Sequence, residues 1–76
     1  MYKIYKLDRY STDYYLCDEN MIVLRWFYII KNKHISRIFN NGIMKLNSSP
    51  KECIYELSNI QEAINQLEQL RVLLSV

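Results

Sequence analysis

The sequence predicts an α+β domain, in which a small antiparallel β-meander of about four to five strands carries a C-terminal α-helix on one face. Residues 1–47 are rich in β-branched and aromatic side chains separated by short polar turns. Residues 48–76 instead repeat apolar side chains at the three- and four-residue spacing of a helix. Because the chain has 76 residues, we expect one domain, 1–76, with a small core.

The first three predicted strands are read from alternation and composition. Residues 2–7 alternate apolar and polar side chains, residues 8–13 are typical of a turn, and residues 14–17 are rich in aromatic side chains. A polar turn, Asp18-Glu19-Asn20, then leads into residues 21–31. This last run is dense in β-branched and aromatic side chains, as central strands are.

Two more strands complete the predicted meander. Asn32-Lys33 is expected to reverse the chain into residues 35–39, and Asn41-Gly42 is a type I′ hairpin signal before residues 43–46.

An alternative interpretation makes residues 20–39 one helix, giving an N-terminal hairpin plus two or three helices. Lys33, His34 and Arg37 suit the C-terminal end of such a helix, and Gly42 suits the position after it. We prefer strands, because apolar residues surround the first half of this helix and a chain so small would hardly bury them.

The C-terminal helix, predicted within residues 48–76, has a capping signal and an apolar stripe. Ser49-Pro50-Lys51-Glu52 has the pattern of a capping box with proline at the first helical position, so we predict that the helix begins there. The stripe consists of Cys53, Leu57, Ile60, Ile64, Leu67 and Leu74. Asn59 followed by Glu62 offers a second cap, which leaves open a break near Ser58.

The surplus of apolar surface predicts binding. A strand over residues 21–31 has apolar side chains on both faces, with Val23, Arg25, Phe27 and Ile29 on one of them, whereas one helix covers one face. The other face requires sheet curvature, a second copy or a partner. We therefore predict a non-enzymatic protein-binding module whose partners are a larger protein target and a second copy in a homodimer. The candidate protein-binding residues are Arg25, Phe27, Ile29, Leu70, Leu73 and Leu74.

The composition also hints at origin. Ile, Asn, Lys and Tyr are abundant, a bias that AT-rich codons produce. Together with the small size, this suggests an accessory protein of a phage or other mobile element that inhibits or modulates a host protein.

The alternative function is nucleic-acid binding through a basic hairpin. Its candidate residues are Lys31, Lys33, His34, Arg37 and Lys45. Residues 1–47 are net basic and residues 48–76 net acidic, but the formal net charge is only +2 and no known reader motif is present. Basic side chains also protect sheet edges from aggregation, so we favour protein binding.

Catalysis, cofactors and membrane insertion are not expected. The chain has one histidine, no glycine-rich phosphate loop and no nucleophile elbow, so we predict no enzyme, no cofactor and no metal site. Cys17 and Cys53 lack redox or metal spacing and are expected to be reduced. Arg25 interrupts the longest apolar run, and no signal-peptide pattern is present, so a cytoplasmic protein without membrane contact is expected.

Overall fold

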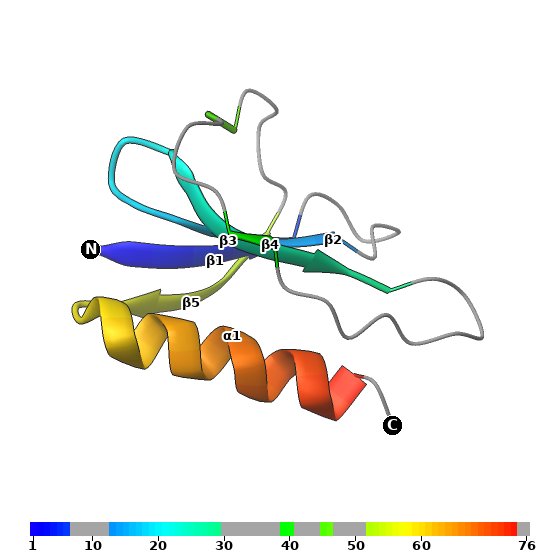
Figure 1. The fold of residues 1–76 in the computed structure, drawn as a ribbon. Coiled ribbons are helices and arrows are strands. Elements are labelled where there is room, and N and C mark those ends of the chain that lie inside the picture. Colours follow the sequence, from blue (N-terminus) through cyan, green and yellow to red (C-terminus); the bar gives the residue numbers. More distant parts are fainter. Residues whose placement is uncertain (7–12, 30–38, 41–44, 47–51, 75–76) are drawn as a thin grey trace.

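The fold is an antiparallel sheet with one helix across a face (Figure 1). The computed structural model describes residues 1–6, 13–29, 39–40, 45–46 and 52–74. Within these residues, the elements are β1 (Tyr2–Lys6), β2 (Asp13–Cys17), β3 (Val23–Tyr28), β4 (Phe39–Asn40), β5 (Glu52–Leu57) and α1 (Ile60–Leu74). The predicted α+β class with a packed C-terminal helix is confirmed, and the alternative of a helix over residues 20–39 is wrong, because β3 lies inside that range.

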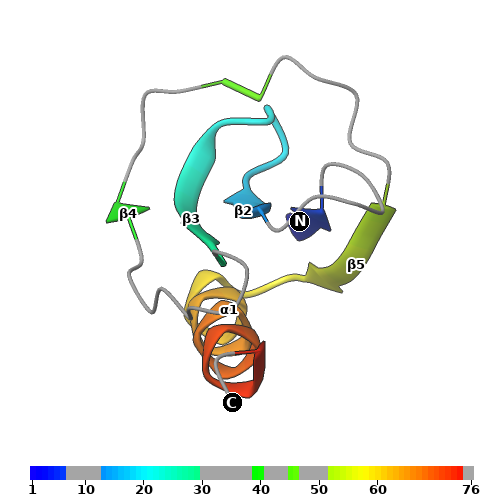
Figure 2. The same cartoon turned by 90° about the vertical axis from the view of Figure 1, so that its right-hand side faces the viewer.

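The strand order is β4-β3-β2-β1-β5. The first four strands pair in chain order, as a meander does, but β5 returns to the opposite edge and pairs antiparallel with β1. Figure 2 shows the strands curving around a common axis, with α1 in the space between β3 and β5. β5 therefore forms an edge of the described sheet directly beside the helix that follows it.

The predicted helix start at residues 49–52 is wrong, because β5 includes Glu52 and α1 begins only at Ile60. The second cap in the sequence is the one that the helix uses. Asn59 Oδ1 accepts hydrogen bonds from the backbone N–H groups of Gln61 at 2.8 Å and Glu62 at 3.1 Å. These bonds satisfy two amides that have no partner within the helix.

Two β-bulges decide which side chains face the helix. On β3, Leu24 is an extra residue, because Leu16 lies opposite Arg25 while Cys17 lies opposite Val23. The extra residue shifts the alternation, so Val23 and Phe27 belong to separate clusters and not to one face as unbroken alternation predicts. On β5 the extra residue is Ile54, between the partners of two consecutive β1 residues.

The main core lies between α1 and the sheet. Its five buried residues have no exposed surface and come from three strands and the helix: Ile4, Leu16, Phe27, Ala63 and Leu67. Phe27 also stacks on half-buried Tyr14, with ring centroids 5.0 Å apart and planes at 15°. At about 1.5–3 kcal/mol for each large apolar side chain, burial of this set is the main contribution that holds α1 on the sheet.

A second, smaller cluster is centred on Tyr5, Cys17 and Val23, against which Trp26 and Leu46 pack. Tyr15 stacks on Trp26 and Trp26 on Tyr28, with centroids 5.7 and 5.6 Å apart. The backbone N–H of Leu46 donates to the Met21 carbonyl at 2.8 Å, which fixes this contact. Residues of the chain itself thus cover part of the second apolar cluster. From the sequence, sheet curvature, a second copy or a partner is expected to cover this second face.

The predicted polar turn after β2 is confirmed. Asp18 Oδ1 accepts hydrogen bonds from the backbone N–H groups of Asn20 at 2.9 Å and Ile22 at 3.0 Å. Met21, next in the turn, has a φ of 65°, in the left-handed region. The predicted hairpin at Asn41-Gly42 lies outside the described residues.

Candidate protein-binding surface

The residues predicted to bind a protein differ in exposure. Phe27 is fully buried, so it belongs to the core and offers no surface to a partner. Ile29, Leu70 and Leu74 are half-buried against the same core. Leu73 is 70% exposed and is the most accessible member of the set.

Arg25, the remaining member of the set, is half-buried. Its Nη1 donates a hydrogen bond to the carbonyl of the preceding residue, Leu24, at 2.9 Å. The exposed part of the predicted site therefore lies on α1.

Of the five basic residues predicted for nucleic-acid binding, one lies within the described residues. Lys31, Lys33, His34 and Arg37 lie outside the described residues. Lys45 is exposed and forms an isolated bridge with Ile22. Nucleic-acid binding therefore stays a prediction from sequence.

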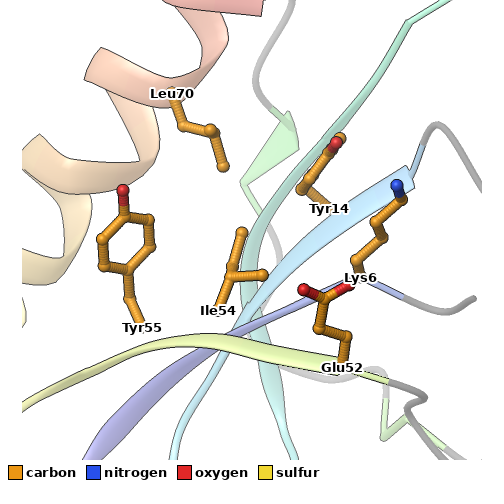
Figure 3. A pocket seen from close by; sticks show the side chains of 6 residues that line it. All are labelled: Lys6, Tyr14, Glu52, Ile54, Tyr55 and Leu70. Atoms are coloured by element: carbon orange, nitrogen blue, oxygen red, sulfur yellow. The ribbon is translucent and has the colours of Figure 1, made fainter. Parts of the chain in front are cut away.

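A surface groove of about 340 Å³ lies between the sheet and α1 (Figure 3). Its lining combines apolar and charged side chains from β1, β2, β5 and α1: Lys6, Tyr14, Glu52, Ile54, Tyr55 and Leu70. Figure 3 shows Leu70 reaching from the helix toward Ile54, with Tyr55 beside the helix and Lys6 near Glu52. We call this site the β5–α1 groove.

The bulge on β5 explains why this strand lines the groove with consecutive residues. Regular alternation would turn Ile54 and Tyr55 to opposite faces, yet both line the groove. Ile54 and Leu57 also pack against the main core, whereas Tyr55 remains 38% exposed. The groove thus has an apolar floor and one accessible aromatic side chain.

Leu73 does not line the groove but is the neighbour of a helix residue that does. It lies three residues after Leu70, and residues at this spacing are neighbours on a helix surface. Leu73 and the 54% exposed Val72 also line a shallow hollow of about 420 Å³ on the outer side of the helix. We call the β5–α1 groove together with Leu73 the β5–α1 surface.

Acidic charge dominates β5 and α1, two of the elements that form this surface. Residues 52–74 contain four glutamates and one arginine, Arg71, which forms an ion pair with Glu68. On β5, Glu56 forms an exposed ion pair with Lys3 of β1, with Nζ and Oε1 3.2 Å apart, and this hydrogen bond raises the pKa of Lys3. Glu52 pairs in register with Lys6 at the end of the groove.

Tyr14 contributes a neutral hydroxyl to the groove. Burial raises the pKa of Tyr14, and the negative charge of Glu52 raises it further. The phenol therefore stays protonated around neutral pH and can donate a hydrogen bond to a ligand.

Sequence reasoning identified the leucines of this surface but missed its strand residues. Ile54, Tyr55 and Glu52 were assigned to a helix because of the Ser-Pro-Lys-Glu pattern before them. The available signal was Cys-Ile-Tyr at residues 53–55, which favours a strand.

Among the residues that the structure describes, no three His, Cys, Asp or Glu side chains are grouped to hold a metal ion. Within them, no helix combines the length and apolar character needed to cross a membrane. Comparisons with models of protein families, with curated proteins and with solved structures find no match.

Proposed function

We propose that this protein is a non-enzymatic module that binds another protein through the β5–α1 surface. The observation that carries the proposal is the position of Leu73, which is 70% exposed next to a groove with an apolar floor. A single exposed leucine is ordinary on a protein surface. Here it neighbours Leu70 on α1, which lines the groove together with the partly exposed Tyr55, while Lys6 and Glu52 lie at the other end of the groove. An apolar centre with a polar rim is the usual arrangement of a protein interface.

The partner in this proposal is a larger protein, which the small domain inhibits or modulates. The small size and the abundance of amino acids with AT-rich codons support an accessory protein of a phage or mobile element. A second copy of the chain is the alternative occupant, because Val72 and Leu73 would bury their apolar surface against the same residues of a dimer partner.

Capture of a target with matched variants tests this proposal. Tagged wild-type protein and Leu73→Ser are compared in lysate of the native host, with and without nuclease. We expect one stoichiometric protein that survives nuclease and is lost or strongly reduced with Leu73→Ser. Light scattering of the purified protein gives its molar mass and so shows whether it also forms a dimer without the target.

Ile60→Ser is the matched control. Ile60 is a 42% exposed apolar residue at the other end of α1, so its replacement removes exposed apolar area away from Leu73. Circular dichroism verifies that both variants stay folded. Equal capture by wild type and Leu73→Ser, or capture that disappears with nuclease, would reject protein binding at this surface.

A further inference from the structure

We infer that the partner enters the β5–α1 groove as an extended, basic segment that adds a strand to the edge of β5 that pairs with no other described strand. This inference rests on the proposed function and specifies the class of ligand. It follows from the position of β5 in the sheet, from the groove beside it and from the charge of the chain that forms the edge.

The position of β5 provides the hydrogen-bonding groups. β5 is six residues long and stands last in the strand order, and among the described residues it pairs only with β1. A strand at the end of a sheet has a row of backbone N–H and C=O groups that point away from its partner. An added strand satisfies these groups with backbone hydrogen bonds of its own.

The groove provides side-chain specificity. Successive side chains of an extended segment point to opposite faces, so every second one would enter the space between the sheet and α1. There it would meet Ile54, Tyr55 and Leu70. A helical ligand could contact the same apolar floor, but it would leave the outward backbone groups of β5 without a partner in the interface.

The charge of the edge selects a basic segment over a second copy. Glu52 and Glu56 both lie on β5, where Glu56 forms an ion pair with Lys3 and Glu52 pairs in register with Lys6. Both lysines lie on β1, one strand farther from the added chain. Pairing β5 with β5 of a second copy would place four glutamates along one strand pair. Lysine or arginine side chains on the incoming strand would instead face opposite charge on their nearest neighbour.

Synthetic peptides test the inference with the full chain. The probes are a blocked Lys-Val alternating hexapeptide, its Glu-Val counterpart, and the Lys-Val peptide with N-methylated amides along one edge. Backbone amide exchange of ¹⁵N-labelled protein is recorded by NMR with each peptide. We expect the Lys-Val peptide to slow exchange of β5 amides, and the other two to leave it unchanged.

Charge reversal on the protein provides the matched control. Glu52→Lys should weaken binding of the Lys-Val peptide by about fivefold, because one attractive pair becomes repulsive. Glu62→Lys makes the same charge change at an exposed position of α1 that does not line the groove, and should alter the affinity by less than about twofold.

Other outcomes overturn the inference. Failure of the Lys-Val peptide to bind, equal binding of the N-methylated peptide, or binding without slower exchange at β5 would each reject strand addition. Protection of β5 that rises with protein concentration alone would identify a second copy as the occupant. A captured target that depends on Leu73 but leaves β5 exchange unchanged would reject the strand and retain the proposed function.

Discussion

At the scale of single residues, a difference in burial gives the two free cysteines different thiol reactivity. Cys53 is exposed, whereas Cys17 is fully buried beside Val23 in the second cluster. Burial, with a smaller effect of the Asp18 charge, raises the pKa of the Cys17 thiol to about 12. The thiolate is the reactive form of cysteine, so the fold keeps Cys17 unreactive at neutral pH.

The raised pKa predicts a loss of stability at high pH. The ordinary value for the Cys17 thiol is 9.0, so the unfolded chain loses its proton first. The stabilising effect of burying the neutral thiol is complete below that value and is lost as the pH rises from about 9 to about 12. The free energy of unfolding, measured by urea titration at several pH values, should therefore fall above pH 9.

Cys17→Ala distinguishes the loss of stability due to Cys17 from the loss due to the tyrosines. Burial also raises the pKa values of Tyr5, Tyr14 and Tyr15, which add a loss of the same sign at higher pH. The variant should be less stable at neutral pH but should show a shallower decline above pH 9. An identical decline in wild type and variant would show that Cys17 does not contribute.

The left-handed conformation of Met21 predicts an unusual order of substitutions. Its φ of 65° penalises β-branched side chains and suits glycine. Met21→Val should be less stable than Met21→Gly by about 1 kcal/mol, although valine is the more apolar residue. Thermal or urea unfolding of both variants measures this difference. Greater stability of the valine variant would contradict the turn geometry.

At the scale of elements, local patterns predicted the strands better than the boundary before the helix. Asp18-Glu19-Asn20 and the β-branched, aromatic run after it identified the β2–β3 hairpin. β5 was missed because residues 49–52 have the pattern of a capping box and because Cys53 and Leu57, four residues apart, fit the spacing of a helical stripe. In the structure Cys53 is exposed, and the bulge turns Ile54 toward the core instead. The long-range pairing with β1 that creates the bulge cannot be read from the local sequence.

The cap at Asn59 can be tested by removal of its side-chain oxygen. Asn59→Ala should lower the free energy of unfolding by about 1 kcal/mol, because the amides of Gln61 and Glu62 lose their acceptor. Ser58→Ala, at the exposed neighbouring residue, should change it by less than about 0.5 kcal/mol. Equal effects would mean that the helix does not begin with an Asn59 cap.

The two sides of α1 should respond differently to the same substitution. Leu67 is fully buried in the main core, so Leu67→Ala should destabilise the fold by about 2–5 kcal/mol. Leu73 is mostly exposed, and Leu73→Ala should change stability by less than about 0.5 kcal/mol. Chemical denaturation distinguishes them. A large loss for Leu73→Ala would place this residue in the core and remove it from the candidate surface.

At the scale of the whole molecule, the fold distributes apolar side chains of β3 between two separate clusters. α1 covers the cluster around Phe27, and Leu46 packs on the cluster around Val23. Among the described residues, accessible large apolar side chains remain at Met1, Tyr55, Ile60, Val72 and Leu73. Of these, Tyr55 lines the groove and Leu73 neighbours its residue Leu70. The sequence allowed a prediction of the late leucines, because helical periodicity is local, but Tyr14 and Lys6 join the site only through sheet pairing.

The central claim is that the β5–α1 surface binds a protein, and calorimetric titration of the captured target tests it most directly. Wild type is compared with Leu73→Ser, Tyr55→Ser and the control Ile60→Ser, each verified as folded. The account predicts that Leu73→Ser and Tyr55→Ser, on different elements, each weaken binding by about tenfold or more, while the control stays near wild type. Wild-type affinity in both surface variants would contradict it.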